Sequence, residues 1–231
     1  IVLPDAALLT GADDRVETHA YDAAGNRIST RDALGGTESW TYDALGRRLS
    51  FTNEKGSVWT YEHDAAGRVI REDSPVVTLA ATHPDGAGLQ LLAGAPQDER
   101  VTTLLTYDGT GNLVKRMEAA GRPEERTTQY EYDAVGRQVR VIFPPVRVYD
   151  PSLDNLTASL GAEPAEVART PETRTFYNVF GEATANLDVG GALSQKVHDG
   201  AGRLLYDIDA AGFVTGYGYG AFGEVTRLTR Y

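Results

Sequence analysis

The sequence predicts an all-β chain in which repeated antiparallel β-hairpins form a wide, curved sheet with two insertions on one edge. Three observations predict this class. A unit of the form Tyr-Asp-x-x-Gly recurs eight times, four of the seven intervals between its glycines are 21 residues, and the segments between turn signals are about six residues long. Strand-length segments between regularly spaced turn signals indicate hairpins rather than helices. A fixed period of this kind is typical of repeat proteins, whose units pack mainly on their neighbours.

The unit defines eight repeats, numbered here by their glycines from Gly25 (repeat 1) to Gly223 (repeat 8). Asp favours the first position of a type I turn, where its carboxylate accepts from backbone N–H groups, and Gly at the fourth position adopts a left-handed conformation without steric cost. This pair is a common hairpin connection, often followed by a bulge. We therefore expect the signature residues to be structural. They are Tyr21, Asp22, Gly25, Tyr42, Asp43, Gly46, Asp64, Gly67, Tyr107, Asp108, Gly111, Tyr132, Asp133, Gly136, Tyr177, Gly181, Asp199, Gly202, Tyr219 and Gly223.

A second turn is predicted ten residues after the first in five repeats, at Gly35, Gly56, Gly121, Gly191 and Gly212. Asp, Asn or Glu stands three places before each of these glycines. Each repeat is therefore predicted to consist of a turn, a strand, a second turn and a second strand. First and second turns then lie on opposite edges of the sheet.

The predicted strands have two unlike rows of side chains on one face, because side chains two apart share a face. The positions four and six before the first glycine are both aromatic or His in five repeats, as at Trp40 and Tyr42. Neighbouring repeats are expected to stack these side chains into ladders worth roughly 0.2–1 kcal/mol per contact. Three residues after the glycine the side chain is aliphatic in six repeats, but two residues further on it is apolar in only three. A sandwich core needs both rows apolar, so we expect a single sheet with solvent or a cargo on its second side.

Two intervals are 44 and 45 residues long, and in each the second glycine is replaced by an extra segment, residues 75–100 and residues 144–171. Both insertions are expected on the same edge, about 20 Å apart for four strands at ~4.8 Å. Apart from them, residues 1–231 are predicted to be a single array of about eight repeats from Tyr21 to Tyr231. Loops carry function more often than scaffolds do, although these segments could equally cap or widen the edge.

The two insertions are predicted to differ in structure. The first has two apolar runs around His83-Pro84-Asp85-Gly86 and is expected to be hairpin-like. The second has Leu153, Leu156 and Leu160 at helical spacing, which predicts a short helix that ends at Gly161.

The composition excludes several classes of partner. The net charge is −11, which disfavours binding to nucleic acid and to anionic membrane surfaces. There is no cysteine, so disulfides and thiolate metal sites are excluded. No apolar run reaches the ~18 residues that a membrane span needs. Residues 1–10 carry neither an initiator Met nor a signal-peptide pattern, and we expect the chain to be a piece of a longer one.

Candidate catalytic motifs have simpler explanations. His63-Asp64 and His198-Asp199 resemble acid–base pairs, but each occupies the Tyr-Asp position of a repeat, where the turn needs the Asp. Residues 218–223 match the G-x-G-x-x-G pattern of dinucleotide sites, which requires a following helix, whereas residues 224–230 are strand-like. We therefore expect no catalytic residue, and the chain is not predicted to be an enzyme.

No cofactor or metal site is predicted. His19 and His83 have no partners at ligand spacing. The turn carboxylates could gather Ca²⁺, but no repeat brings two or three of them together and turn capping already explains each Asp. The sequon Asn155-Leu-Thr157 is expected to be silent.

The signature resembles a known repeat. The segments Tyr42-Asp-Ala-Leu-Gly46-Arg-Arg-Leu49 and Tyr132-Asp-Ala-Val-Gly136-Arg-Gln-Val139 are similar to the YD repeat of bacterial Rhs proteins, which also occurs in insecticidal Tc toxin components and teneurins. The resemblance covers roughly residues 15–231 without the insertions. It implies a ribbon of hairpins coiled into a spiral shell, which in bacterial members holds a toxic C-terminal polypeptide and in teneurins belongs to an adhesion receptor.

The resemblance therefore implies a non-enzymatic wall segment of a secreted or cell-surface bacterial Rhs/YD-repeat protein that encloses a polypeptide cargo such as a C-terminal toxin. This chain lacks the D-P-x-G element of the family's self-cleaving closure and any variable toxin segment, so self-processing and toxicity are not transferred to it. The expected partners are other YD repeats of the parent chain and the enclosed polypeptide, and exposed edge strands predict edge-to-edge self-association. An extracellular adhesion or carbohydrate-binding module, using aromatic rows or the insertions, is the alternative.

Overall fold

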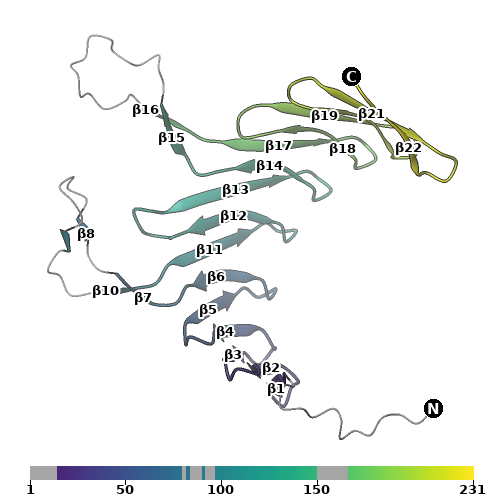
Figure 1. The fold of residues 1–231 in the computed structure, drawn as a ribbon. Coiled ribbons are helices and arrows are strands. Elements are labelled where there is room, and N and C mark those ends of the chain that lie inside the picture. The colour runs from purple at the N-terminus through teal and green to yellow at the C-terminus, as the bar shows by residue number, and fades with distance from the viewer. Residues whose placement is uncertain (1–14, 80–81, 84–89, 92–96, 150–165) are drawn as a thin grey trace, which may run out of the picture. The chain divides into compact units, whose positions relative to one another are not determined.

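The computed structural model describes residues 15–79, 82–83, 90–91, 97–149 and 166–231, and every regular element in them is a β-strand (Figure 1). Sixteen strands form one antiparallel sheet, and three pairs of short strands lie outside it. The predicted all-β class, built from repeated antiparallel hairpins, is confirmed.

The chain divides into two compact units, residues 1–105 with 118–125 and residues 106–117 with 126–231. The first unit contains repeats 1 to 3, the first insertion and the start of repeat 4. Its main strands are β1 (Thr18–Tyr21), β2 (Arg27–Arg31), β3 (Thr37–Tyr42), β4 (Arg48–Thr52), β5 (Val58–His63), β6 (Val69–Asp73) and the first four residues of β11 (Thr102–Tyr107).

The second unit contains the first turn of repeat 4 (residues 106–117), repeats 5 to 8 and the second insertion, whereas the second turn of repeat 4 (residues 118–125) belongs to the first unit. Its main strands are the end of β11, β12 (Leu113–Glu118), β13 (Arg126–Tyr132), β14 (Gln138–Ile142), β17 (Glu172–Tyr177), β18 (Ala183–Leu187), β19 (Leu193–His198), β20 (Leu204–Ile208), β21 (Val214–Tyr219) and β22 (Val225–Arg230).

The strand order of the sheet follows the chain except at the insertions. It is β1-β2-β3-β4-β5-β6-β11-β12-β13-β14-β17-β18-β19-β20-β21-β22. At the insertions β6 pairs with β11 and β14 pairs with β17. Strands β1 and β22 are the edges of this order. That residues 1–231 act as a single array stays a prediction.

Seven of the eight first-turn hairpins are shown to close with a bulge. In repeat 1, Ala20 lies opposite Ser29 but Tyr21 lies opposite Arg27, so Ile28 is the extra residue. The same shift of register occurs in repeats 2, 3 and 5 to 8. A bulge of this kind bends the strand and adds right-handed twist.

The sheet is a single layer within the described residues. None of their apolar side chains is buried, and Gly216 is their one buried residue. Both faces therefore keep contact with solvent, and the stabilising contacts run mainly along each face from strand to strand. This is the arrangement in which stability comes from neighbouring repeats.

The first insertion contains two short strand pairs. Strand β7 (Val77–Leu79) pairs with β10 (Gln97–Glu99), and β8 (Thr82–His83) pairs with β9 (Gln90–Leu91). Its predicted turn at residues 84–86 lies outside the described residues.

The second insertion begins and ends as a strand pair, β15 (Val146–Tyr149) with β16 (Glu166–Arg169). The helix predicted from Leu153, Leu156, Leu160 and Gly161 lies outside the described residues. In each unit the insertion leaves the sheet on the edge that carries the second turns (Figure 1).

Candidate functional site

The repeated turn is the candidate site, and repeat 2 shows its geometry. The Asp43 Oδ1 atom accepts hydrogen bonds from the backbone N–H groups of Leu45 and Arg47, both at 2.9 Å. The Gly46 N–H donates to the Asp43 carbonyl at 3.0 Å, and the Asp43 N–H donates to the Arg47 carbonyl at 2.9 Å. Gly46 has a φ of 75°, which a residue with a Cβ rarely adopts. The four bonds close the turn within five residues.

The structure places the other signature residues in turns of the same kind. All eight first-turn glycines have φ between 75° and 97°. In each first turn the glycine N–H donates to the carbonyl three residues before it, at 3.0 to 3.2 Å. The second-turn glycines also have positive φ. Sequence reasoning therefore found where the backbone reverses, and these residues lie along the two edges rather than converging on one point.

An Arg directly after the first-turn glycine completes the turn in four repeats. The Arg47 Nε atom donates to Asp43 Oδ2 at 2.6 Å. The Arg47 backbone N–H, then its side chain, hold the pKa of Asp43 below its ordinary value. The same ion pair joins Arg68 to Asp64, Arg137 to Asp133 and Arg203 to Asp199.

Repeat 4 closes its turn without an Arg. The hydroxyl of Thr110 and the amides of Asn112 donate to the Asp108 carboxylate. Mainly through Thr110, they lower the pKa of Asp108 to about 2. The turn carboxylates are thus held in their charged form by groups of their own turn, and in the described residues no three His, Asp or Glu side chains are grouped to hold a metal ion.

In four repeats the tyrosine of the signature joins its hairpin to the preceding one. The Tyr42 hydroxyl donates to the Arg27 carbonyl at 2.9 Å, and the Tyr219 hydroxyl donates to the Leu204 carbonyl at 2.7 Å. In both cases the acceptor lies two residues after the glycine of the preceding repeat. The same bond joins Tyr132 to Leu113 and Tyr177 to Gln138.

The arginine of the signature makes a second tie, in the forward direction. The Arg47 Nη1 atom donates to the Asp64 carbonyl at 2.9 Å, so it joins the turn of repeat 2 to the turn of repeat 3. Arg137 reaches the Asn178 carbonyl at 3.4 Å in the same way, and its guanidinium lies 4.5 Å from the centre of the Tyr177 ring. Cation–π contacts of this kind add roughly 0.5–1 kcal/mol at exposed sites.

The first-turn glycine also lies close to the side chain that follows the glycine of the preceding repeat. A Cβ at Gly46 would lie 3.3 Å from Asn26 Oδ1, and one at Gly202 would lie 2.7 Å from Glu182 Oε1. Asn26 and Glu182 both directly follow the glycine of the preceding repeat. A Cβ at these two glycines would make the Asn26 or Glu182 side chain shift, in addition to the strain of a positive φ.

The junction between repeats 6 and 7 uses different residues. Glu182 stands where four other repeats have Arg, and it accepts from the Asn178 amide at 2.6 Å. His198 replaces the tyrosine of repeat 7. Its Nδ1 atom is buried without a hydrogen-bond partner and lies 3.9 Å from Glu182 Oε2.

One aromatic row crosses three strands of the first unit. Phe51 stacks on Trp40 with centroids 5.7 Å apart and on Trp59 with centroids 5.4 Å apart, at interplanar angles of 23° and 28°. The Arg27 guanidinium lies 4.7 Å from the centre of the Trp40 ring. The ring faces therefore cover one another, whereas binding of a sugar by stacking needs an open ring face. Phe51 comes from the row after the glycine, so the ladder differs from the predicted stacking of the aromatic pairs alone.

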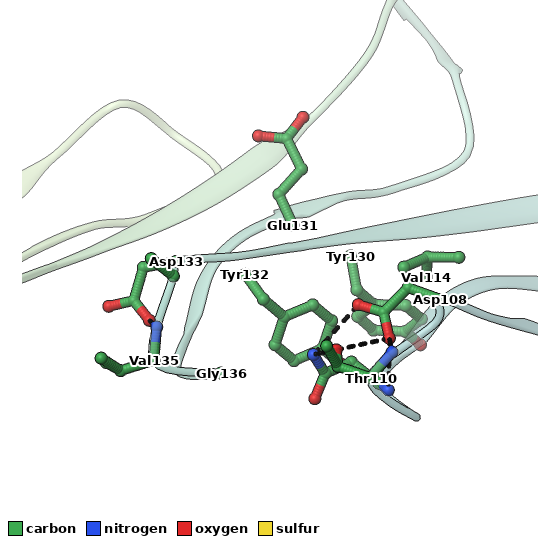
Figure 2. Close-up of a pocket in the computed structure, with 11 residues that line it drawn as sticks. Asp108, Thr110, Val114, Tyr130, Glu131, Tyr132, Asp133, Val135 and Gly136 are labelled. Atoms are coloured by element: carbon green, nitrogen blue, oxygen red, sulfur yellow. Dashed lines mark hydrogen bonds between the residues drawn. The ribbon is translucent and has the colours of Figure 1, made fainter.

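An open groove lies between the first turns of repeats 4 and 5. Asp108 and Thr110 line it from one turn and Asp133 from the next, and Figure 2 shows Tyr130 and Tyr132 between them. Glu131 points away from both tyrosine rings (Figure 2). The carboxylate oxygens of Asp108 and Asp133 accept hydrogen bonds within their own turns, so the groove offers aromatic edges rather than an acid–base pair.

Sequence reasoning missed the tyrosine hydroxyl bond and the forward reach of the arginine. A signal for the first was present, because the position before the turn Asp is Tyr in six repeats and His in two, and never Phe or Leu. A position that only needed a ring would also accept Phe. The need for a polar atom at the ring's end was therefore visible.

Within the part of the chain that the structure describes, no helix has the length and apolar character needed to cross a membrane.

The sequence matches the RHS repeat family over residues 21–52 and again over residues 42–76. No curated protein matches the chain. Among solved structures, TcdB2-TccC3 without its hypervariable C-terminal region is 15% identical, with a TM-score of 0.49, over 93% of this chain and 11% of its own. TcdB2-TccC3-TEV is 13% identical, with a TM-score of 0.46, over 96% of this chain and 13% of its own. The Photorhabdus luminescens Tc holotoxin pore is 13% identical, with a TM-score of 0.40, over 94% and 12%. The chain thus spans 11 to 13% of the solved chains named here.

Proposed function

We propose, from the match to the RHS repeat family over residues 21–52 and 42–76, that the chain is a non-enzymatic wall segment of a longer RHS/YD-repeat protein that encloses a polypeptide. The wall is built from the repeats themselves. The enclosed polypeptide is a segment of the same parent chain, such as a C-terminal toxin. The parent is a secreted or cell-surface bacterial protein.

The observation that carries this proposal is that the polar groups of the signature bind within the array. The Asp43 carboxylate is bound by its own turn, the Arg47 guanidinium reaches the next turn, and the Tyr42 hydroxyl reaches the preceding hairpin. A catalytic site needs reactive groups that converge and remain available to a substrate. Groups that hold one hairpin to the next fit a wall better than a catalyst.

The single-layer sheet also supports a wall. Within each unit, taken by itself, the described strands of the sixteen-stranded sheet form one layer and none of their apolar side chains is buried, so we propose that both faces are available to further repeats, solvent or cargo. The net charge of −11 disfavours nucleic acid as the enclosed material.

The test uses the full-length parent polypeptide purified under native conditions. Mass spectrometry identifies any C-terminal peptide that stays associated, and added protease measures its protection. We expect the peptide to be retained and resistant, while the same peptide expressed alone is degraded. That control separates enclosure from intrinsic resistance.

A parent without a protected peptide would contradict the enclosing role. The adhesion alternative would then gain weight, and the segments at residues 75–100 and 144–171 would be the first place to search for a partner.

A further inference from the structure

The two insertions interrupt the sheet at the same position of the repeat. Ser74 and Phe143 each stand seven residues after a first-turn glycine, where repeat 1 has the second-turn Asp32. The Asp32 N–H donates across the turn to the Gly36 carbonyl at 2.9 Å. The equivalent bond survives at both insertions, since the Ser74 N–H donates to the Val101 carbonyl at 2.9 Å and the Phe143 N–H donates to the Pro171 carbonyl at 2.9 Å.

At the first insertion Ser74 Oγ takes the place of the turn carboxylate in one further bond, from the Val101 N–H at 2.8 Å, but neither insertion has the second-turn glycine. In repeat 1 the Asp32 Oδ1 atom accepts from the Leu34 and Gly36 N–H groups at 2.9 and 2.7 Å, and the Gly35 N–H donates to the Asp32 carbonyl at 3.1 Å. Phe143 has no side-chain acceptor. The cost of closing a loop rises with its length, so a long insertion joins its two strands less firmly than a five-residue turn does.

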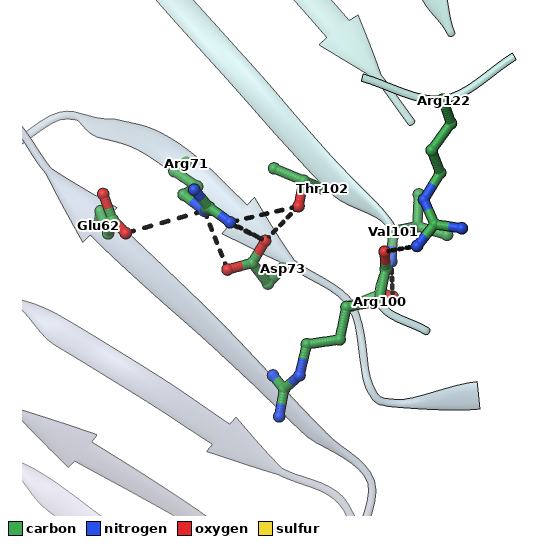
Figure 3. Close-up of polar contacts among 8 residues, drawn as sticks. Glu62, Arg71, Asp73, Arg100, Val101, Thr102 and Arg122 are labelled. Carbon is green, nitrogen blue, oxygen red and sulfur yellow. Dashed lines mark hydrogen bonds and ion pairs between the residues drawn. The ribbon is translucent and has the colours of Figure 1, made fainter. Parts of the chain in front are cut away.

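A charged cluster lies at the root of the first insertion (Figure 3). The Arg71 guanidinium donates to Asp73 from Nε at 3.0 Å and from Nη2 at 3.1 Å. The Thr102 hydroxyl, on the returning strand, donates to Asp73 at 2.6 Å. Glu62 lies directly opposite Arg71 on β5, with 3.8 Å between Oε1 and Nε. The cluster therefore joins β5, β6 and β11 on one face of the sheet.

The returning segment is also held. The Val101 N–H donates to Ser74 Oγ at 2.8 Å, and Arg122 pairs with Glu99 and donates to the Arg100 carbonyl (Figure 3). The side chains of Ser74 and Arg122, which lie outside residues 75–100, therefore hold the returning end of the first insertion.

The second insertion has a matching cluster in the second unit. The Arg140 Nε atom donates to Glu172 at 2.8 Å, and its Nη1 atom donates to Glu131 at 3.0 Å. Glu131 lies directly opposite Arg140 on β13, and Glu172 is the first residue of the returning strand β17. Arg174 donates to the other oxygen of Glu172 at 2.7 Å.

The two clusters share a pattern that the other six repeats lack. Each has Arg four residues after the first-turn glycine, Glu five residues before that glycine on the opposite strand, and a carboxylate at the insertion root. The carboxylate comes from the outgoing strand at Asp73 and from the returning strand at Glu172. In the other repeats the corresponding opposed pairs are Ser29 with Ala20, Ser50 with Thr41, Lys115 with Thr106, Ala185 with Phe176, Tyr206 with Val197 and Arg227 with Gly218.

We propose that Arg71 and Arg140 are clamps that hold the sheet together where a second turn has been replaced by an insertion. The sheet at these two points then depends on the clamp and on the retained backbone bond, not on the sequence of the inserted segment. Inserted segments of different length can therefore be accommodated at these two positions without a change in the repeats on either side. Arg71 accordingly lowers the pKa of Asp73, and Arg140 lowers the pKa of Glu172, as expected of groups that hold those carboxylates in charged form.

The first test measures amide hydrogen exchange in the full chain. Arg71→Gln is expected to speed exchange of the Ser74 amide about tenfold and to leave the Phe143 amide unchanged. Arg140→Gln is expected to do the reverse. Arg227→Gln is the matched control, because Arg227 occupies the same repeat position but faces Gly218, and neither amide should respond to it.

The second test asks whether the clamp matters only where the turn is missing. Residues 74–101 are replaced by the five-residue turn of residues 32–36. In the parent chain Arg71→Gln is expected to lower the thermal midpoint by about 3 °C. In the tight-turn chain the same substitution is expected to have no effect, because the turn itself joins β6 to β11.

Equal shifts in both chains would overturn the proposal, since Arg71 would then stabilise the strand regardless of the insertion. If the tight-turn chain does not fold, the exchange experiment decides alone. The proposal would also be overturned if the Ser74 amide exchanged at the same rate in Arg71→Gln as in the parent chain.

Discussion

At the scale of single residues, two glycines of the first turns differ in whether their backbone conformation requires glycine. Gly136 is the turn glycine of repeat 5 and has a φ of 81°. Gly200 lies inside the turn of repeat 7, outside the left-handed region and with open space where a Cβ would be, and five other repeats have Ala at its position. Substitutions at these two glycines therefore separate the effect of a positive φ on stability from the effect of lying in a turn.

Gly136→Ala is expected to lower the free energy of unfolding by about 1–2 kcal/mol, because Ala is strained at positive φ. Gly200→Ala is expected to leave it unchanged or to raise it by up to about 1 kcal/mol, because Ala restricts the unfolded chain. Urea denaturation followed by circular dichroism measures both. Equal effects of the two substitutions would show that the turn assignment is wrong.

At the scale of the element, a first turn that begins with Asp binds the carboxylate of that Asp through hydrogen bonds within the turn. The pKa of Asp22, Asp43, Asp64, Asp133 and Asp199 is lowered by hydrogen bonds within each turn. The pKa of Asp108 falls to about 2, from an ordinary value of 3.8. Because the folded state favours the charged form, these groups stabilise the fold above the ordinary pKa, and their contribution is lost as the pH falls through the lowered values.

We expect the thermal midpoint to fall between pH 4 and pH 2 as these turns are protonated. Asp108→Asn should make that fall shallower, because an amide oxygen still accepts the turn N–H groups but does not titrate. Asn53 and Asn178 already close turns in this way. Differential scanning calorimetry across this range checks the prediction, and a profile unchanged by the substitution would count against it.

The turn is also the element that the sequence predicts best. The Asp-x-x-Gly spacing acts within five residues, so one copy such as Asp43 to Arg47 contains all the information for the backbone reversal. The bond from Tyr219 to the Leu204 carbonyl depends instead on the register between two hairpins, which a single copy of the signature does not specify. The cluster of Arg71, Asp73 and Thr102 was hidden for the same reason, since 29 residues of sequence separate Asp73 from its returning partner.

At the scale of the whole molecule, the strand order of the described residues ends at β22. Strand β22 is paired on one side only. The Tyr231 N–H donates toward β21, to the Val214 carbonyl, and backbone groups alternate in direction along a strand. The Leu228 N–H therefore points away from the sheet, where another chain can pair with it.

The isolated chain is expected to self-associate through such an edge as its concentration rises. Leu228→Pro removes an outward N–H and should shift the chain toward the monomer, whereas Leu228→Ala keeps that N–H and should associate nearly as the parent does. Sedimentation velocity over a concentration series measures the difference. A monomeric parent at every concentration would rule out edge pairing.

The junction between repeats 6 and 7 bears on how such a chain is inherited. Repeats look like copies that duplication or recombination could exchange freely. Yet Glu182 faces His198, whereas Arg137 faces Tyr177, so each repeat carries half of a match whose other half lies in its neighbour. A crossover that placed repeat 7 directly after repeat 5 would set His198 after Arg137, an order that the chain already has at Arg47 and His63. A crossover that placed Glu182 before a repeat with tyrosine would create an order that the chain does not have. Viable rearrangements should therefore keep Glu182 with His198, and at this point the unit of descent is the junction rather than the repeat.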